Sequence, residues 1–582
     1  MNQKTAMNGG ERIAEVLQAQ GVSSLYTLCG GHISPILVAA RARGIRVVDV
    51  RHEATAVFAA DASARLSGLP GVAVVTAGPG VSNTLTALKN AQLAQSPLVL
   101  IGGAAPTVLQ GRGALQDIDQ ARLVTGQVKW LRKVRNVADL APAVAQAFAV
   151  ACQGVPGPVF IECPVDLLYD EASIRGWYAE AGARGHSWAE RLQRWYLHRH
   201  VSRMFADRHP GRSYRVSAAG SRQAVPSTVI DRVVKTLARA ERPLLLVGSQ
   251  AVIDVAHVEQ VAKAVAAVQL PFYLSGMARG LLGRAHPRQL FHHRRQALRE
   301  ADCVILAGVP CDFRLDYGRH VRRSASLIVA NRSRREARLN RRPTITAVGD
   351  AGFFLETLAE RLGTPTGRNE WLTALRGRDT ERELEIIQQA AKVGEYVNPL
   401  ALFREIERIA DDQAIMVADG GDFVATAAYT LRPRGPLRWL DPGVFGTLGV
   451  GAGFTLGAAV NRPGAELWLI WGDGACGFSL IEFDSLVRHG IPVIAVVGND
   501  AGWTQIAREQ VKLLGDAVGT ELARSDYDRV ATALGAEGIQ IRSMAEMPGA
   551  LARARTLAHS GHPVLINVWL DQSRFREGSI SM

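Results

Sequence analysis

The stretch from Glu466 to Asp500 constrains the fold of this 582-residue chain more than any other part. Residues 467–471 and 491–497 are apolar runs typical of buried parallel strands. Between them, apolar residues recur at helical spacing over residues 479–488. The stretch therefore predicts two parallel strands joined by a helix, which is the repeating unit of an α/β domain.

Glycines and oxygen-bearing side chains follow both of these predicted strands. Gly472, Asp473 and Gly474 follow the first strand, and Asn499 with Asp500 closes the second. Because ligands of open α/β sheets gather at the carboxyl ends of the strands, we expect Asp473 and Asn499 to lie side by side. Their oxygens suit Mg²⁺, and glycines let backbone N–H groups approach a diphosphate at a helix start. An ordinary Gly-rich turn is the alternative, which the added Asn-Asp pair disfavours.

This segment resembles the diphosphate- and metal-binding motif of thiamine diphosphate (ThDP) enzymes, which begins Gly-Asp-Gly and ends in Asn. The nearest match is the acetolactate synthase-like and 2-hydroxyacyl-CoA lyase branch, which is related to oxalyl-CoA decarboxylase. The resemblance implies ThDP and Mg²⁺ as cofactors. It also implies Asp473, Asn499 and Ala501 as metal ligands, and Gly472, Asp473, Gly474, Ala475, Asn499, Gly502 and Trp503 as cofactor contacts.

Strand and helix patterns alternate through three parts of the chain, and a single core rarely grows beyond ~250–300 residues. We therefore expect an α/β fold of three doubly wound parallel-sheet domains. The resemblance identifies them as pyrimidine-binding, central Rossmann-like and diphosphate-binding domains of the ThDP-enzyme fold. The expected boundaries are 8–175 for the first domain, 176–225 for a basic linker, 226–365 for the central domain, 395–572 for the third domain and 573–582 for a flexible tail.

Glu53 stands at the start of a predicted helix that follows a predicted strand, in the sequence RHEATAVFAADA. By itself such a Glu is explained by the helix dipole, which favours acidic groups in the first turn. In ThDP enzymes, a Glu at this place hydrogen-bonds N1′ of the aminopyrimidine and favours the tautomer whose N4′ removes the C2 proton. The resemblance therefore assigns this catalytic role to Glu53, and a partly buried carboxyl that can share a proton suits it.

Two further turns match the same family. The sequence TAGPGVSN resembles the Gly-Pro-Gly turn of the first domain, which implies that Gly78, Pro79 and Asn83 lie near the pyrimidine. The sequence DPGVFGTLG resembles a turn in which a Gly carbonyl accepts from N4′ and an apolar side chain wedges beneath the cofactor. Gly446 and Leu448 match these two places, although Leu448 could equally be an ordinary core residue.

Several features differ from a plain acetolactate synthase. The turn CGGHISP replaces the usual first-domain turn, NDAGWTQIAREQ follows the metal motif, and GMARGLLGRAHP resembles the acyl-CoA branch. The resemblance implies a 2-hydroxyacyl-CoA lyase that releases formyl-CoA and an aldehyde or ketone, and that catalyses the reverse carboligation. His32, Gln116 and Trp503 are candidates to line the substrate side. His32 could move a proton near neutral pH, although a lone His is more often structural.

The chain is basic, with a formal net charge of +13, and residues 288–342 are rich in Arg. Arg-rich surfaces complement the phosphates of coenzyme A, although solvated charge is the usual explanation for such runs. A basic surface can also indicate nucleic-acid binding. We expect no nucleic-acid partner, because no basic-aromatic RNA-binding module is visible.

We expect a cytoplasmic protein without a membrane span. No apolar stretch reaches the ~20 residues that a span needs, and the Gly-rich residues 444–460 predict a buried helix instead. The N-terminus has no apolar core of a signal peptide. Six cysteines at positions 29, 152, 163, 303, 311 and 476 form no CxxC pair, which favours free thiols in a reducing compartment.

The resemblance also implies a homodimer or homotetramer with active sites between subunits. Glu53 of one chain would then serve the cofactor held by Asp473 and Asn499 of another. Three alternative functions stay open at this point: an acetolactate synthase acting on pyruvate, an oxalyl-CoA-type decarboxylase, and a non-catalytic relative that binds nucleic acid. The sequence also leaves open whether FAD or ADP binds the central domain.

Overall fold

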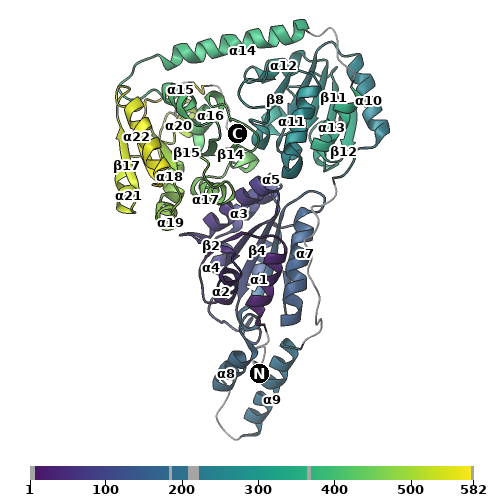
Figure 1. Ribbon diagram of the computed structural model, residues 1–582, viewed down its shortest axis with the longest axis vertical. Coiled ribbons are helices and arrows are strands. Elements are labelled where there is room, and N and C mark those ends of the chain that lie inside the picture. The colour runs from purple at the N-terminus through teal and green to yellow at the C-terminus, as the bar shows by residue number, and fades with distance from the viewer. Residues whose placement is uncertain (1–6, 182–186, 207–221, 363–368, 574, 578–582) are drawn as a thin grey trace. The chain divides into compact units, whose positions relative to one another are not determined.

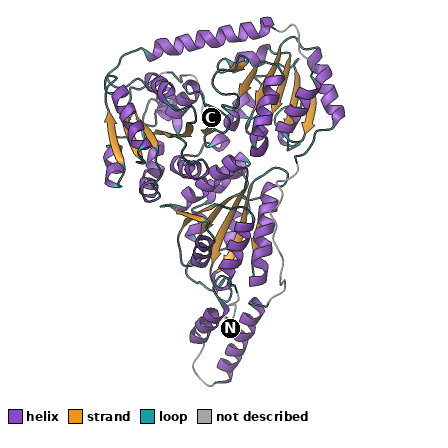
Figure 2. Cartoon of the chain, in the orientation of Figure 1, coloured by secondary structure: helices purple, strands orange, loops and turns teal. Residues whose placement is uncertain are grey.

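The computed structural model describes residues 7–181, 187–206, 222–362, 369–573 and 575–577. The chain divides into a smaller unit, Met1–Ala64 with Leu69–Gly220, and a larger unit, Arg65–Gly68 with Ser221–Met582. The described residues form three parallel sheets of six strands each, flanked by helices (Figure 1, Figure 2). This confirms the expected α/β fold with three doubly wound sheets.

The first sheet lies in the smaller unit, and its strand order is β2-β1-β3-β4-β6-β5. One face is covered by three helices, whose apolar residues join those of the strands in one core. The helices are α1 (Gly9–Ala19), α2 (Ser34–Ala42) and α7 (Leu140–Cys152). The strands are β1 (Ser24–Leu28), β2 (Arg46–Asp49), β3 (Gly71–Val75), β4 (Leu98–Ala104), β5 (Trp130–Lys133) and β6 (Pro158–Pro164).

The third sheet has the order β14-β13-β15-β16-β18-β17. Counted along each domain, the first and third sheets therefore share one strand order: second, first, third, fourth, sixth, fifth. The turns after corresponding strands occupy corresponding places at the carboxyl edge of each sheet. The strands are β13 (Ile415–Asp419), β14 (Trp439–Leu440), β15 (Leu467–Gly472), β16 (Ile494–Asn499), β17 (Glu537–Ile541) and β18 (Val564–Trp569).

The central sheet has the order β12-β11-β10-β7-β8-β9. This is the order of a dinucleotide-binding α/β domain, which confirms the Rossmann-like prediction. Its strands are almost wholly buried, as expected for a parallel sheet covered on both faces. They are β7 (Pro243–Val247), β8 (Phe272–Leu274), β9 (Gln289–Leu290), β10 (Cys303–Ala307), β11 (Ser326–Asn331) and β12 (Ile345–Val348).

The unit between β15 and β16 differs from its prediction in one respect. The helix begins at Asp473 as α18 (Asp473–Ser479), passes through a short 3-10 turn and continues as α19 (Phe483–Arg488). Apolar spacing predicts a helix only from residue 479. The sequence DGACGFS carries too few apolar residues to reveal the first turns, although Asp473 suits the positive end of the helix dipole.

Part of the predicted linker, residues 176–225, is helical and packed. Helix α9 (Trp188–Met204) begins with a capping box between Ser187 and Glu190. Val201 and Met204 at its far end join the core of the first sheet. Part of the predicted basic linker is therefore a helix packed at one end, which has no long apolar stripe to reveal it in the sequence. The linker residues 182–186 and 207–221 lie outside the described residues.

The C-terminal tail was expected to be flexible from residue 573. Phe575 packs edge-on against Tyr429, with ring centroids 5.9 Å apart. The guanidinium of Arg382 lies 5.1 Å from the Phe575 ring, and that of Arg576 lies 4.7 Å from the Tyr429 ring. The described part of this segment is therefore packed, and the tail residues 574 and 578–582 lie outside it.

Within the described ranges, no helix is both long enough and apolar enough to cross a membrane. The Gly-rich stretch 444–460 includes all but the last residue of α17 (Gly451–Asn461), which is largely buried, as predicted. The six cysteines are free thiols.

Candidate active site

The pairing of β15 with β16 brings the two halves of the predicted metal site together. Gly472 lies opposite Gly498 in this parallel register, so Asp473 and Asn499 leave neighbouring strands at the same edge of the sheet. The expectation that these two positions lie side by side is confirmed. Whether Asp473 and Asn499 fit a metal ion depends on the burial and the hydrogen-bond partners of each side chain.

The Asp473 carboxylate is buried at the start of α18. Its Oδ1 accepts a hydrogen bond from the Gly474 N–H at 2.8 Å, and its Oδ2 accepts one from the Gly502 N–H at 3.1 Å. Burial, followed by the negative charge of Asp500, raises the pKa of Asp473 to about 7. A bound cation would restore the charged carboxylate, so this environment fits a metal ligand.

Asn499 is fully buried at the end of β16. Its Nδ2 donates to the Ser525 carbonyl oxygen and to Asn567 Oδ1, both at 3.2 Å. Its Oδ1 is also buried, and no donor in the described part of the chain reaches it. A buried amide oxygen rarely stays without a partner, and a hard cation is a suitable one. The side chains of Asp473 and Asn499 therefore fit Mg²⁺.

The loop after β16 closes over the same edge. Ala501 has a positive φ of 58°, and its carbonyl oxygen accepts from the Leu522 N–H at 2.9 Å. That hydrogen bond leaves the carbonyl one lone pair for a metal ion. The ring of Trp503 lies against Gly474 so closely that a Cβ there would sit 2.5 Å from it. Gly474 is thus required beside Trp503.

Asp419, at the end of β13, is a residue of this edge that sequence reasoning missed. It accepts hydrogen bonds from the N–H groups of Gly449 and Gly451, the latter at 2.8 Å, and from Trp471 Nε1 at 3.3 Å. Burial raises its pKa to about 7. One buried carboxylate therefore ties the turn around Leu448 to the end of β15. The sequence ADGGDF, a polar cluster directly after an apolar run, is the signal that could have revealed it.

The turn that contains Gly446 and Leu448 is less buried than its flanks. Gly446 is exposed and has a positive φ of 64°, and Leu448 is partly buried. A Cβ built on Gly420 would sit 3.4 Å from a methyl carbon of Leu448, so Leu448 lies beside the turn after β13. A partly open Leu suits the predicted wedge better than the alternative of a core residue.

In the smaller unit, the structure brings Glu53 and Asn83 together. Glu53 is buried at the start of α3 (Glu53–Ser67), and its Oε2 accepts from Asn83 Nδ2 at 2.9 Å. Gly78 has a positive φ of 61° and precedes α4 (Pro79–Ser82). A glycine suits this strained turn because it has no Cβ.

His32 lies in the turn after β1, at the same edge as Glu53. Its Nδ1 is 3.2 Å from Thr76 Oγ1, and a Cβ on Gly103 would sit 2.7 Å from the His32 Cβ. Burial lowers the pKa of His32, so the neutral imidazole dominates at pH 7. A neutral ring can accept or donate one proton, as the predicted role requires.

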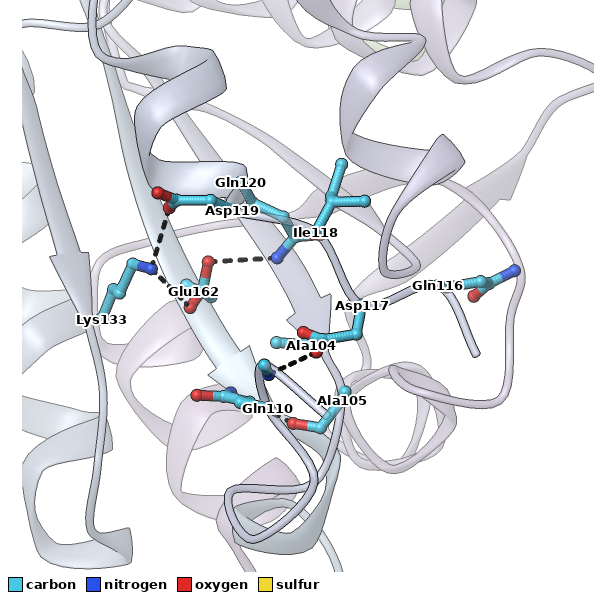
Figure 3. A pocket seen from close by; sticks show the side chains of 11 residues that line it. Ala104, Ala105, Gln110, Gln116, Asp117, Ile118, Asp119, Gln120, Lys133 and Glu162 are labelled. Atoms are coloured by element: carbon cyan, nitrogen blue, oxygen red, sulfur yellow. Dashed lines mark hydrogen bonds and ion pairs between the residues drawn. The ribbon is translucent and has the colours of Figure 1, made fainter. Parts of the chain in front are cut away.

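A cavity of about 240 Å³ lies at the ends of β4 and β6, with Gln116 on one side and a polar cluster on the other (Figure 3). In the cluster, Gln120 Nε2 donates to Glu162 Oε2 at 3.2 Å, and Lys133 Nζ lies 3.7 Å from Glu162 Oε1. Burial raises the pKa of Glu162. Gln120 Oε1 also accepts from the Gly78 N–H at 2.9 Å, which holds the Gly-Pro-Gly turn. Sequence reasoning missed this cluster.

The predicted site residues thus form two groups, one in each unit. Glu53, His32, Gly78, Asn83 and Gln116 gather at the carboxyl edge of the first sheet. Asp473, Asn499, Ala501, Trp503 and the turn around Leu448 gather at the carboxyl edge of the third. Because the two sheets share one strand order, the groups occupy related places.

The two groups of predicted site residues lie in parts of the chain that match models of a known protein family. Three family models match: the N-terminal TPP binding domain of thiamine pyrophosphate enzymes over residues 7–123, the central domain over 230–358 and the C-terminal TPP binding domain over 419–568.

Individual relatives match over the whole chain. The chain is 48% identical to 2-hydroxyacyl-CoA lyase 2 of Homo sapiens, covering 100% of this chain and 93% of the relative. It is 47% identical to the protein of the same name from Caenorhabditis elegans, covering 100% and 92%. It is 33% identical to acetolactate synthase large subunit IlvG of Mycobacterium tuberculosis, covering 97% and 96%.

Proposed function

The chain belongs to the thiamine pyrophosphate enzyme family, and from this premise we propose that it is a 2-hydroxyacyl-CoA lyase. It would cleave a 2-hydroxyacyl-CoA to formyl-CoA and an aldehyde or ketone, and would catalyse the reverse carboligation. The observation that carries this proposal is the 48% identity to a 2-hydroxyacyl-CoA lyase 2 along the entire chain, against 33% to an acetolactate synthase.

The third domain supplies the cofactor-holding groups. Asp473, Asn499 and the Ala501 carbonyl would hold Mg²⁺, and the unpartnered Asn499 Oδ1 supports this assignment. Backbone N–H groups at the start of α18, near Gly474, would face the diphosphate. When bound, ThDP supplies an electron sink for the carbanion left by carbon–carbon cleavage.

The first domain supplies the groups that handle protons. Glu53 would hold a proton at N1′ of the aminopyrimidine, and Asn83 orients its carboxylate. His32, neutral at pH 7, would take the proton of the substrate hydroxyl. Gln116 would line the substrate side with Trp503. The apolar ring of Trp503 would exclude water from that side of the site.

A homodimer or homotetramer with active sites between subunits, which the family resemblance implies, is part of this proposal. A cytoplasmic location stays a prediction, based on the free cysteines. Occupancy of the central Rossmann-like domain by FAD or ADP stays open.

Parallel assays of the purified protein with ThDP and Mg²⁺ test the proposal. The protein would receive 2-hydroxyacyl-CoAs, oxalyl-CoA and pyruvate in separate reactions, with products identified by mass spectrometry. We expect formyl-CoA and the matching aldehyde from the first substrate class alone. Acetolactate formed from pyruvate without CoA, or carbon dioxide released from oxalyl-CoA, would instead identify one of the two rival enzymes.

A further inference from the structure

A second cavity, of about 780 Å³, lies within the larger unit and is larger than the cavity near Gln116. It is bounded by the loop before β9, by α14 (Asn369–Ala390), by α15 (Pro399–Ile409) and by the end of α16 (Gly421–Thr430). Helix α14 runs from the central domain to the third domain (Figure 1). A cavity of this size suits a ligand of small-molecule dimensions.

Arginines dominate the charge of this cavity. Its lining includes five guanidinium groups and three carboxylates, and no other Asp, Glu or Lys among the described residues contributes to it. The residues are Arg284, Arg376, Arg404, Arg408 and Arg432, with Asp379, Glu383 and Glu407. The count leaves two positive charges in excess, and Arg284 and Arg408 pair with Asp412 and Glu405, which lie outside the lining.

The three carboxylates are engaged in structural hydrogen bonds. Asp379 Oδ1 accepts from the N–H groups of Phe291 at 3.0 Å and His292 at 2.7 Å. Glu383 pairs with Arg432 and with His292 Nε2. The third acid, Glu407, pairs with the buried Arg434 at 2.5 Å. Because Arg284, Arg408 and Arg432 each pair with a carboxylate, the lining arginines without such a partner among the described residues are Arg376 and Arg404.

Arg376 on α14 and Arg404 on α15 have no ion pair or side-chain hydrogen bond to any described residue. Their guanidinium groups border the cavity from two different helices. Neither side chain is needed for the packing of its helix, since both residues are exposed. Two such guanidinium groups, presented by two helices at one cavity, are suited to bind one ligand with several anionic groups.

The wall behind Arg432 adds positive charge and a flat surface. The Arg432 guanidinium stacks on the ring of Phe291, 4.0 Å from its centroid. Arg279 lies nearby, donates to the Ala428 carbonyl oxygen at 2.8 Å and has no carboxylate partner within the described ranges. Burial lowers the pKa of Arg279 to about 10; the negative charge of Asp441 opposes this shift, and the charges of Arg432 and Arg294 add to it. Guanidinium groups in such surroundings are stabilised by an anion.

We propose that this cavity binds the phosphorylated adenosine end of the acyl-CoA substrate, with Arg376 and Arg404 as its phosphate-binding residues. The identity of the ligand rests on the proposed function. The chemistry itself is that of an adenosine carrying several phosphates, so a free adenosine nucleotide is the other source of the same groups. Two experiments test the site, and the first separates these sources independently of the reaction.

The first experiment measures binding alone. Adenosine 3′,5′-bisphosphate and ADP would be titrated calorimetrically into the wild type and into the double variant Arg376→Ala/Arg404→Ala. We expect the double variant to bind adenosine 3′,5′-bisphosphate at least about tenfold more weakly, because it loses the charge-assisted hydrogen bonds of two guanidinium groups. The control variant Arg323→Ala/Arg553→Ala, at exposed arginines outside the cavity, should bind as the wild type does.

Absence of binding to the wild type, or equal affinity in the wild type and the double variant, would overturn the proposal. Tighter binding of ADP than of adenosine 3′,5′-bisphosphate, with the same loss in the double variant, would assign the site to a free nucleotide and would overturn its assignment to the substrate. Neither outcome depends on whether the protein turns over a 2-hydroxyacyl-CoA.

The second experiment locates the site along the substrate. The KM for a 2-hydroxyacyl-CoA should rise about tenfold or more in the double variant, with little change in kcat, because the phosphates lie far from the reacting carbon. The KM for the matching 2-hydroxyacyl-pantetheine, which lacks the nucleotide, should not change. An equal rise for both substrates, or no rise for either, would contradict the assignment. A protein that turns over neither substrate would refute the lyase function and leave the binding result intact.

Discussion

Glu53, Asp419 and Asp473 are buried carboxylates at the carboxyl ends of strands, where α/β proteins place their ligands. Burying an acid is costly unless hydrogen bonds or a cation compensate for the lost water. Asn83 and backbone N–H groups provide part of this compensation. Three such acids at two sheet edges indicate sites built for chemistry, and Glu53 and Asp419 each lead to a prediction.

Replacement of Glu53 by Gln removes the proton-sharing carboxyl and keeps the shape of the side chain. We expect Glu53→Gln to lower kcat by about 10²–10⁴-fold, which is the usual contribution of a general acid–base group. ThDP binding, measured by the quenching of tryptophan fluorescence, should change far less. Glu171→Gln, another acid in the first turn of a helix, is the matched control and should keep full activity. Unaltered turnover in Glu53→Gln would remove the basis of the assigned role.

Asp419 predicts a pH dependence of stability. Its pKa is about 7 in the folded protein and near 3.8 when unfolded, so the folded state binds the proton more tightly. The stability that Asp419 contributes is therefore fully present below pH 3.8 and is lost as pH rises through about 7, by at most ~1.4 kcal/mol per pH unit. Asp419→Asn should lack this decline, so its destabilisation relative to the wild type should shrink between pH 4 and pH 7.

Urea unfolding of the cofactor-free protein at several pH values measures this effect. At its largest, the destabilisation should reach about 1–3 kcal/mol, because an amide cannot accept from all three N–H donors that Asp419 serves. Asp412→Asn, at an exposed carboxylate, controls for the loss of one negative charge. A destabilisation that stays constant with pH would show that burial does not control the protonation of Asp419.

At the scale of elements, α18 joins the metal motif to the loop after β16. Gly474 faces the Trp503 ring and leaves no room for a methyl group, whereas a Cβ on Gly477 of the same helix would meet nothing within 4 Å. Gly474→Ala should move Trp503 and its loop at a cost of about 1–3 kcal/mol, because overpacking strains both elements. ThDP affinity should fall by about tenfold or more.

Titration with ThDP in the presence of Mg²⁺, followed by tryptophan fluorescence, measures this change. Gly477→Ala should bind ThDP as the wild type does, and a helix gains slightly when Ala replaces Gly in its interior. Equal losses in both variants would mean that helix flexibility matters, and that the contact with Trp503 does not.

At the scale of the whole molecule, the first and third sheets share one strand order, and their carboxyl edges carry the two groups of predicted ThDP-site residues. We expect the active form to join the edge of one chain to the edge of another. Mixing inactive Glu53→Gln protein with inactive Asp473→Ala protein, after dissociation and reassembly, should therefore restore activity. Random pairing places both intact residues at about a quarter of the sites of a symmetric dimer.

Activity assays before and after mixing test this arrangement, with each variant carried alone through the same procedure as its control. Recovery near a quarter of the wild-type rate supports shared sites. Mixtures that stay inactive, although mass spectrometry shows that hybrid dimers have formed, would place each complete site within a single chain.

The sequence predicted those parts of the protein whose signals are local. Strand–turn–helix patterns located the three sheets, and short motifs located Glu53, Asp473 and Asn499 because each is flanked by recognisable neighbours. The start of α18 and the packed end of α9 escaped because Gly-rich and one-sided helices carry weak apolar periodicity. Asp419 escaped because its hydrogen-bond partners lie about thirty to fifty residues along the chain.

By itself, the sequence determined the fold class, the family and the chemical groups at each strand end, since these follow from patterns within a few residues. The tertiary structure decided which of those groups meet. It left Asn499 Oδ1 without a partner, joined the turn around Leu448 to β15 through Asp419, and gathered unpaired arginines from α14 and α15 around one cavity. Those features depend on contacts between distant segments, because burial and the pairing of charges are properties of the packed chain.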